Sequence, residues 1–134
     1  MIRYINISFM LFLFLVLTSC ESSNSLIMDR GSYFYKNENY NEAANQFNKV
    51  ILSYPQNINL LRSKDIEILA HAYQQLALCQ SKLAILSNDM TNKKIYFNEA
   101  IENIKKAERL VIKPQKREEY RKTHLGIKFQ LESL

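Results

Sequence analysis

The sequence predicts an all-α protein. From about residue 26 almost to the end of the chain, apolar side chains recur at intervals of three and four residues, which is the spacing of one face of an α-helix. The 134 residues contain only two glycines and two prolines, so few positions interrupt this pattern. A short segment near residue 40 also returns near residue 97, which indicates that one kind of helix is used twice. We therefore expect about five helices arranged as antiparallel pairs.

The first 19 residues are typical of a signal peptide. Arg3 supplies a positive charge, and the apolar run over residues 5–17 is shorter than the roughly 20 residues of a membrane-spanning helix. The run ends in Leu17-Thr18-Ser19-Cys20, which resembles the lipobox of bacterial lipoproteins. This resemblance implies cleavage before Cys20, transfer of a diacylglyceryl group to its sulfur, and attachment to a membrane through that lipid. An uncleaved signal anchor, or an ordinary secretory signal with a chance cysteine, is the alternative.

Residues 20–25 are polar and are expected to form a tether in front of a helical domain over residues 26–134. Its first helix should end near residue 37. Asn39 and Glu42 have the spacing of a capping box, in which each side chain accepts a hydrogen bond from a backbone amide at the start of the next helix. The apolar stripe of that second helix consists of Tyr40, Ala43, Ala44, Phe47, Val50, Ile51 and Tyr54. Pro55 should end it.

Three further helices are expected in the rest of the chain. The third occupies much of residues 60–86 and has two apolar lines, so it should be covered on two sides. The second of these lines consists of Ile68, Ala72, Cys79 and Leu86. A polar loop over residues 87–92 should lead to a fourth helix over residues 93–112. Pro114 is suited to the first turn of a fifth helix over residues 115–131.

The composition limits the chemistry that the chain can perform. The net charge of +5 is concentrated in the C-terminal third, where a basic stripe fits anionic headgroups, an acidic protein surface or a merely solvated helix face. Cys79 lies among apolar residues and should be a small buried side chain, without a disulfide partner if Cys20 carries lipid. His71 and His124 are far apart, and no cluster has metal-ligand spacing. We expect no metal, no cofactor and no nucleic-acid partner.

An internal repeat links the second and fourth helices. Tyr40-Asn41-Glu42-Ala43-Ala44 matches Phe97-Asn98-Glu99-Ala100-Ile101, and Phe47 then matches Ile104. The pattern resembles tetratricopeptide repeats, in which small residues let paired helices approach closely and large apolar residues pack beside them. The positions that carry this resemblance are Gly31, Phe34, Tyr40, Ala43, Phe47 and Pro55 in the first unit, and Phe97, Ala100 and Ile104 in a longer second unit. The fifth helix should then cap the array with Tyr120, His124, Leu125 and Phe129.

Residues 26–85 show a narrower resemblance, to the outer-membrane assembly lipoprotein family BamD. Members place a repeat soon after the lipid-bearing cysteine and end its second helix in a Tyr-Pro pair, as Tyr54-Pro55 does here. Leu69-Ala70-His71-Ala72-Tyr73 matches the alanine- and tyrosine-containing helix that follows. The chain has two repeats where the family usually has about five. Glu21, in place of the aspartate that retains enteric lipoproteins at the inner membrane, favours the outer membrane.

These features together predict an adaptor and not an enzyme. The sequence shows no glycine-rich phosphate loop and no nucleophile with a base at readable spacing. In a tetratricopeptide unit the first helix lines the concave face, which here would present Met28, Ser32, Tyr35 and Lys36 to a protein partner. Tyr35 packing on its neighbouring helix is the alternative.

The resemblance to BamD implies a scaffold in outer-membrane protein assembly, with a barrel-assembly subunit as its partner. A pilotin-like lipoprotein that assists a secretin or pilus, or a recruiter of a cell-wall enzyme, is the alternative.

Overall fold

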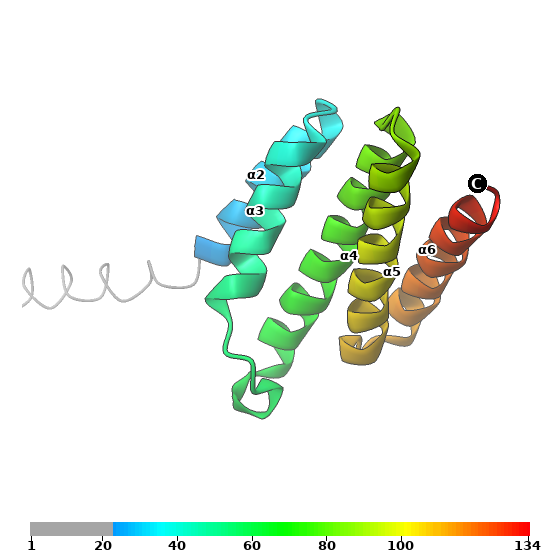
Figure 1. The fold of residues 1–134 in the computed structure, drawn as a ribbon. Helices are drawn as coiled ribbons and strands as arrows, with labels where there is room; N and C mark the ends of the chain where they lie inside the picture. The colour runs from blue at the N-terminus through cyan, green and yellow to red at the C-terminus, as the bar shows by residue number, and fades with distance from the viewer. Residues whose placement is uncertain (1–22) are drawn as a thin grey trace, which may run out of the picture.

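The chain reverses direction at each connection between its α-helices. The computed structural model describes residues 23–134, so the predicted signal peptide (1–19) and the predicted lipidation site Cys20 lie outside the described residues. The described chain contains five α-helices, a short 3₁₀ helix and no strand, which confirms the all-α prediction (Figure 1). These elements are α2 (Ser23–Lys36), α3 (Tyr40–Ser53), η1 (Ile58–Leu60), α4 (Ser63–Leu86), α5 (Met90–Leu110) and α6 (Pro114–Glu132).

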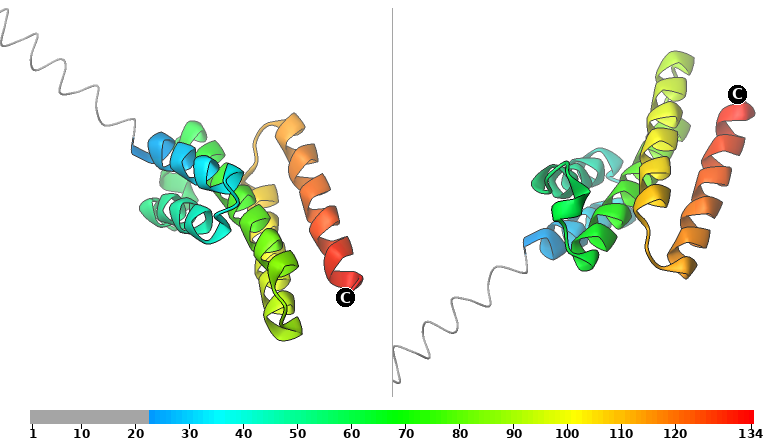
Figure 2. Two further views of the ribbon diagram at one scale, coloured as in Figure 1. Left: turned by 90° about the horizontal axis from the view of Figure 1, so that it is seen from above. Right: turned by 90° about the horizontal axis from the view of Figure 1, so that it is seen from below.

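Helix α4 lies at the centre of the array, with α2 and α3 on one side and α5 and α6 on the other (Figure 2). One of its flanks, with Ala72, Leu76 and Cys79, packs against a cluster from α2 and α3 that contains Phe47. The other flank, with the small side chains Ala70, Ala77 and Ala84, packs against α5 and α6. Small side chains permit close helix contacts on both flanks. The prediction that this helix is covered on two sides is therefore confirmed.

The repeated positions are buried in both helix pairs. Ala43 and Ala100 are fully buried, as are Phe47 and Ile104 at the next repeat position. Phe97 is buried, whereas Tyr40 is half-buried. Phe34 packs at the edge of the first cluster. The repeat seen in the sequence thus corresponds to equivalent packing in α3 and α5.

Gly31 lies where α2 and α3 approach each other closely. A Cβ atom built on Gly31 would lie 2.5 Å from Cε1 of Phe47, far inside van der Waals contact. Because Phe47 is itself fully buried, its ring has little room to move away. The close approach expected from the sequence at this glycine is confirmed.

A side chain caps the start of α3, and a proline follows its end. Asn39 Oδ1 accepts a hydrogen bond from the amide of Glu42 at 3.3 Å, as the capping spacing predicts. The reciprocal half of the capping box is absent among the described residues, because the amide of Asn39 donates to the carbonyl of Phe34 and Glu42 Oε1 accepts from Gln46 instead. Helix α3 ends at Ser53, where Tyr54 is extended before Pro55. Pro55 is exposed, so it stops the helix without contributing to the packing.

Two helix starts differ from the predictions by three residues, and α5 ends at Leu110 where residue 112 was expected. Residues 23–25, expected in the tether, form the first turn of α2, and Ser53 Oγ donates to Asn24 Oδ1 at 3.1 Å. Helix α5 begins at Met90 and not near residue 93, because the carboxylate of Asp89 accepts hydrogen bonds from the amides of Thr91 and Asn92. The loop expected over residues 87–92 is therefore only three residues long.

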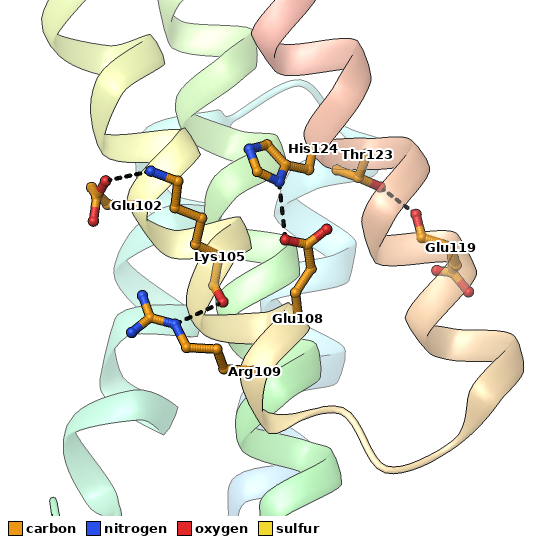
Figure 3. Close-up of polar contacts among 7 residues, drawn as sticks. All are labelled: Glu102, Lys105, Glu108, Arg109, Glu119, Thr123 and His124. Carbon is orange, nitrogen blue, oxygen red and sulfur yellow. Dashed lines mark hydrogen bonds and ion pairs between the residues drawn. The ribbon is translucent and has the colours of Figure 1, made fainter.

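The contact between α5 and α6 differs from the predicted cap. Tyr120 is buried as expected, but Leu125 and Phe129 point to solvent, and Ile127 fills the core position instead. His124 Nδ1 lies 3.0 Å from Glu108 Oε2 of α5, a polar contact between the two helices (Figure 3). Leu86, expected on a buried face of α4, is also exposed. Helix α6 thus covers α5 with a face rotated away from Leu125 and Phe129.

Replacing each of the two glycines by alanine should have opposite effects on the free energy of unfolding. Gly31→Ala should lower the free energy of unfolding by about 1–3 kcal/mol, because the added methyl group overlaps the ring of Phe47. Gly126→Ala should raise it by about 0.5–1 kcal/mol, because a Cβ there meets no atom within 4 Å and alanine is the better helix former. Urea unfolding of the full chain, followed by circular dichroism, measures both. Equal effects at the two sites would contradict this account of the packing.

Candidate functional site

The four residues predicted to line a binding face do not form one site. Met28 is buried and lines a hollow between α2, α4 and α6, and Ser32 is half-buried. Tyr35 packs edge-on against Tyr40, with ring centroids 5.3 Å apart, and burial raises the pKa of its hydroxyl. Lys36 is exposed in the last turn of α2, where a cation interacts favourably with the helix dipole. The structure therefore favours a packing role for Tyr35 and leaves Met28 as the one predicted residue that lines the hollow.

The hollow is formed where α2, α4 and α6 meet near the start of each helix. Its volume is about 340 Å³, within the range of sites that bind small molecules or short peptide segments. We call it the α4 groove, and it is lined by Ser25, Met28, Lys64, Glu67, Ile68, Ala70, His71, Val111, Lys113, Lys116 and Tyr120. Apolar side chains make up much of its lining, while charged groups come from α4, α6 and the connection between α5 and α6.

The charged lining of the α4 groove is predominantly positive. Three lysines contribute ammonium groups, and Glu67 is the only carboxylate in the lining. Lys113 Nζ lies 2.9 Å from Glu67 Oε2, and Lys116 Nζ lies 2.6 Å from Glu119 Oε2 just outside the groove. Both ion pairs are partly exposed, so they are weak and can exchange partners at little cost. An anionic group entering the groove would meet more positive than negative charge.

His71 lies in the same groove and has an unusual environment. Its Nδ1 atom is buried and makes no hydrogen bond with any residue in the described part of the chain. Burial lowers the pKa of the imidazole below its ordinary value of 6.5, and the positive charge of Lys116 lowers it further, against smaller opposing effects of Gln74 and Glu119. The ring is therefore neutral near pH 7, and its Nδ1 atom is a buried polar atom without a partner among the described residues.

The sequence held one signal for this site that the predictions did not use. Lys64, Glu67 and His71 lie three and four residues apart, so they form a polar stripe along an otherwise apolar helix. Lys113, Lys116 and Tyr120 are distant in the sequence, and only the packing of α6 brings them to the same place.

Several other features of the described residues bear on function. No group of three or more His, Cys, Asp or Glu side chains within residues 23–134 is arranged to hold a metal ion. Among the helices that the structure describes, none combines the length and the apolar character needed to cross a membrane. Cys79 is a buried free thiol, and burial raises its pKa to about 12, in agreement with the small apolar role expected for it.

Comparisons of the chain with protein-family models, curated proteins and solved structures gave no match. The case for a function therefore depends on the sequence motifs and on the geometry of the α4 groove.

The environment of His71 predicts a pH dependence of stability. Because its folded-state pKa lies below 6.5, folding excludes a proton that the unfolded chain binds. This contribution is fully present above pH 6.5 and is lost as the pH falls through the lowered pKa of the folded state. The free energy of unfolding should therefore fall more between pH 7 and pH 5 in the wild type than in His71→Gln. An NMR titration that places the imidazole pKa of His71 at or above 6.5 would contradict this expectation.

Proposed function

We propose that the protein is a lipid-anchored, non-catalytic adaptor of a bacterial envelope complex, which binds an anionic segment of a partner protein in the α4 groove. The observation that carries the proposal is the combination of apolar lining side chains with the ammonium groups of Lys64, Lys113 and Lys116 in one hollow. Apolar surface supplies binding energy, and a few charged groups orient the ligand and reject others.

The chemistry of the groove defines the kind of segment that fits. Met28, Ile68 and Val111 favour an apolar side chain, while the lysines favour a carboxylate beside it. Neutral His71 adds no further charge near pH 7. A partner segment with a carboxylate next to a large apolar residue meets both requirements.

The anchor and the complex are proposed on sequence motifs. Leu17-Thr18-Ser19-Cys20 supports lipidation of Cys20. Tyr54-Pro55, followed by the alanine-rich α4, supports the likeness to BamD and thus a role in outer-membrane protein assembly, with a barrel-assembly subunit as partner. The lipid would hold the adaptor at the membrane while the groove binds the partner.

Capture of the partner from membranes tests the groove. The wild-type chain is purified from detergent extracts and the co-purifying proteins are identified, then the double variant Lys64→Gln, Lys116→Gln is compared with it. Loss of two favourable charges should weaken binding about tenfold or more, which corresponds to roughly 1.4 kcal/mol. Circular dichroism should show an unchanged fold, because both side chains lie at the surface of the array.

Lys94→Gln is the matched control, because Lys94 is an exposed lysine of α5 outside the groove. If Lys94→Gln weakens capture as much as the double variant does, the groove is not the binding site. Growth with a radiolabelled fatty acid tests the anchor separately, since label should enter the wild-type chain and not Cys20→Ser.

A further inference from the structure

The connection between α3 and α4 exposes several large apolar side chains. Leu60 is 72% exposed, Leu52 in the last turn of α3 is 75% exposed, and Ile58 is 43% exposed. The connection is nevertheless well ordered by hydrogen bonds, because Asn57 Oδ1 accepts from the amide of Asn59 at 3.1 Å and η1 follows directly. The apolar side chains are thus held outward by a defined turn. Exposed apolar side chains also lie at the opposite end, at Leu86 and Met90, so the choice between the two ends depends on the charges of the connections and on the position of Cys20.

Cations outnumber carboxylates around this turn. Arg62 and Lys64 are both cations, and Arg62 forms a partly exposed ion pair with Asp65 at 2.9 Å, which costs little to break. Arg109 of α5 lines a neighbouring hollow together with Ile58. The 111–113 connection, at the same end of the array, carries Lys113, whereas the two connections at the opposite end carry Glu38 and Asp89 (Figure 1). The surface is therefore complementary to a negatively charged partner.

The turn also lies close to the start of the described chain. Ser23 and Asn24 line a small hollow together with Tyr54, Arg62 and Asp65. Cys20 precedes Ser23 by three residues, so their Cα atoms are at most about 11 Å apart whatever the conformation between them. A lipid on Cys20 would therefore keep this end of the array, and not the α4–α5 turn, near the membrane surface.

We propose that the segment from Leu52 to Arg62 contacts the surface of an anionic phospholipid membrane. Leu52, Ile58 and Leu60 lie at the boundary between headgroups and acyl chains, and Arg62 and Arg109 bind headgroup phosphates. The α4–α5 turn then points away from the bilayer. The inference rests on the proposed lipid anchor at Cys20, to which it adds a second, non-covalent membrane contact and a fixed orientation.

Two labelled variants of the full chain test this orientation. Leu60→Cys and Leu86→Cys place a thiol at similarly exposed positions near opposite ends of α4. Cys79 does not compete for a thiol-reactive fluorophore, because it is buried and its pKa is about 12. Each labelled protein is reconstituted into phosphatidylcholine vesicles with or without phosphatidylglycerol, and doxyl-labelled lipids serve as the quencher.

The expected result is a loss of fluorescence for the label at residue 60 in vesicles with phosphatidylglycerol, and no loss for the label at residue 86. In the Leu60→Cys background, Arg62→Gln with Arg109→Gln should reduce the quenching, whereas the control Lys94→Gln should leave it unchanged. High salt should act like the arginine substitutions, because it screens charge. Equal quenching at both labels, or none at residue 60, would overturn the proposal.

Fatty-acid labelling separates this proposal from the anchor. If the chain is acylated but the label at residue 60 is not quenched, the membrane contact is refuted and the lipid anchor is supported. If the chain carries no acyl group, the labelling is repeated in the Cys20→Ser background, because an unmodified Cys20 would also take the fluorophore. Quenching at residue 60 in anionic vesicles would then support the contact and overturn the anchor.

Discussion

The structure depends on the close packing of helices against both flanks of α4. Ala72 and Cys79 on one flank and Ala70 and Ala77 on the other are small and buried, so neighbouring helices approach the α4 backbone from two sides. Two apolar clusters result, and α4 belongs to both. At the edge of the first cluster, Gly31 leaves the space that the ring of Phe47 fills. A bulkier residue at any of these positions would separate two helices and open a core that a chain of this size has little energy to lose.

The same arrangement produces the α4 groove. Helices α2 and α6 pack mainly on α3 and α5 respectively, and not on each other, so a hollow remains between them over the start of α4. Lys64 and His71 line this hollow because they occupy the polar stripe of α4. Lys113 and Lys116 reach it because α6 begins there. The groove thus results from the antiparallel order of the helices. Its positive charge comes from lysines at the starts of α4 and α6, which meet there.

The two ends of the array differ in the charges of their connections and in the way their helices begin. Asn39 and Asp89 cap α3 and α5 at one end, whereas α4 and α6 begin at the other end without a side-chain cap. The uncapped end carries Arg62, Lys64, Lys113 and Lys116, three of which pair with the carboxylates of Asp65, Glu67 and Glu119 in partly exposed ion pairs. The start of α2 lies beside Arg62 and Lys64. The amide groups at an uncapped helix start and cationic side chains both attract an anion. Both proposals, the partner groove and the membrane contact, therefore concern the end that is nearest to Cys20.

The sequence by itself determined the helices and the repeat. Apolar spacing predicted five helices, Asn39 and Pro55 predicted the limits of α3, and the match of Ala43 with Ala100 predicted equivalent buried positions. These features are local, because they depend on spacing along one helix and on the hydrogen bonds at its ends. The early start of α5 was missed, although the cap at Asp89 is equally local, because the polar run from residue 87 to residue 92 was interpreted as a loop throughout.

Only the tertiary structure decided which face of each helix is buried. Tyr120, Leu125, Ile127 and Phe129 offer two apolar lines on α6, and the packing of α5 selected the line with Tyr120 and Ile127. The α4 groove likewise needed three helices that are far apart in the sequence, so spacing along one helix placed Tyr35 and Lys36 in a site that they do not form. Periodicity shows that a helix has an apolar face, whereas the neighbouring helices determine where that face points.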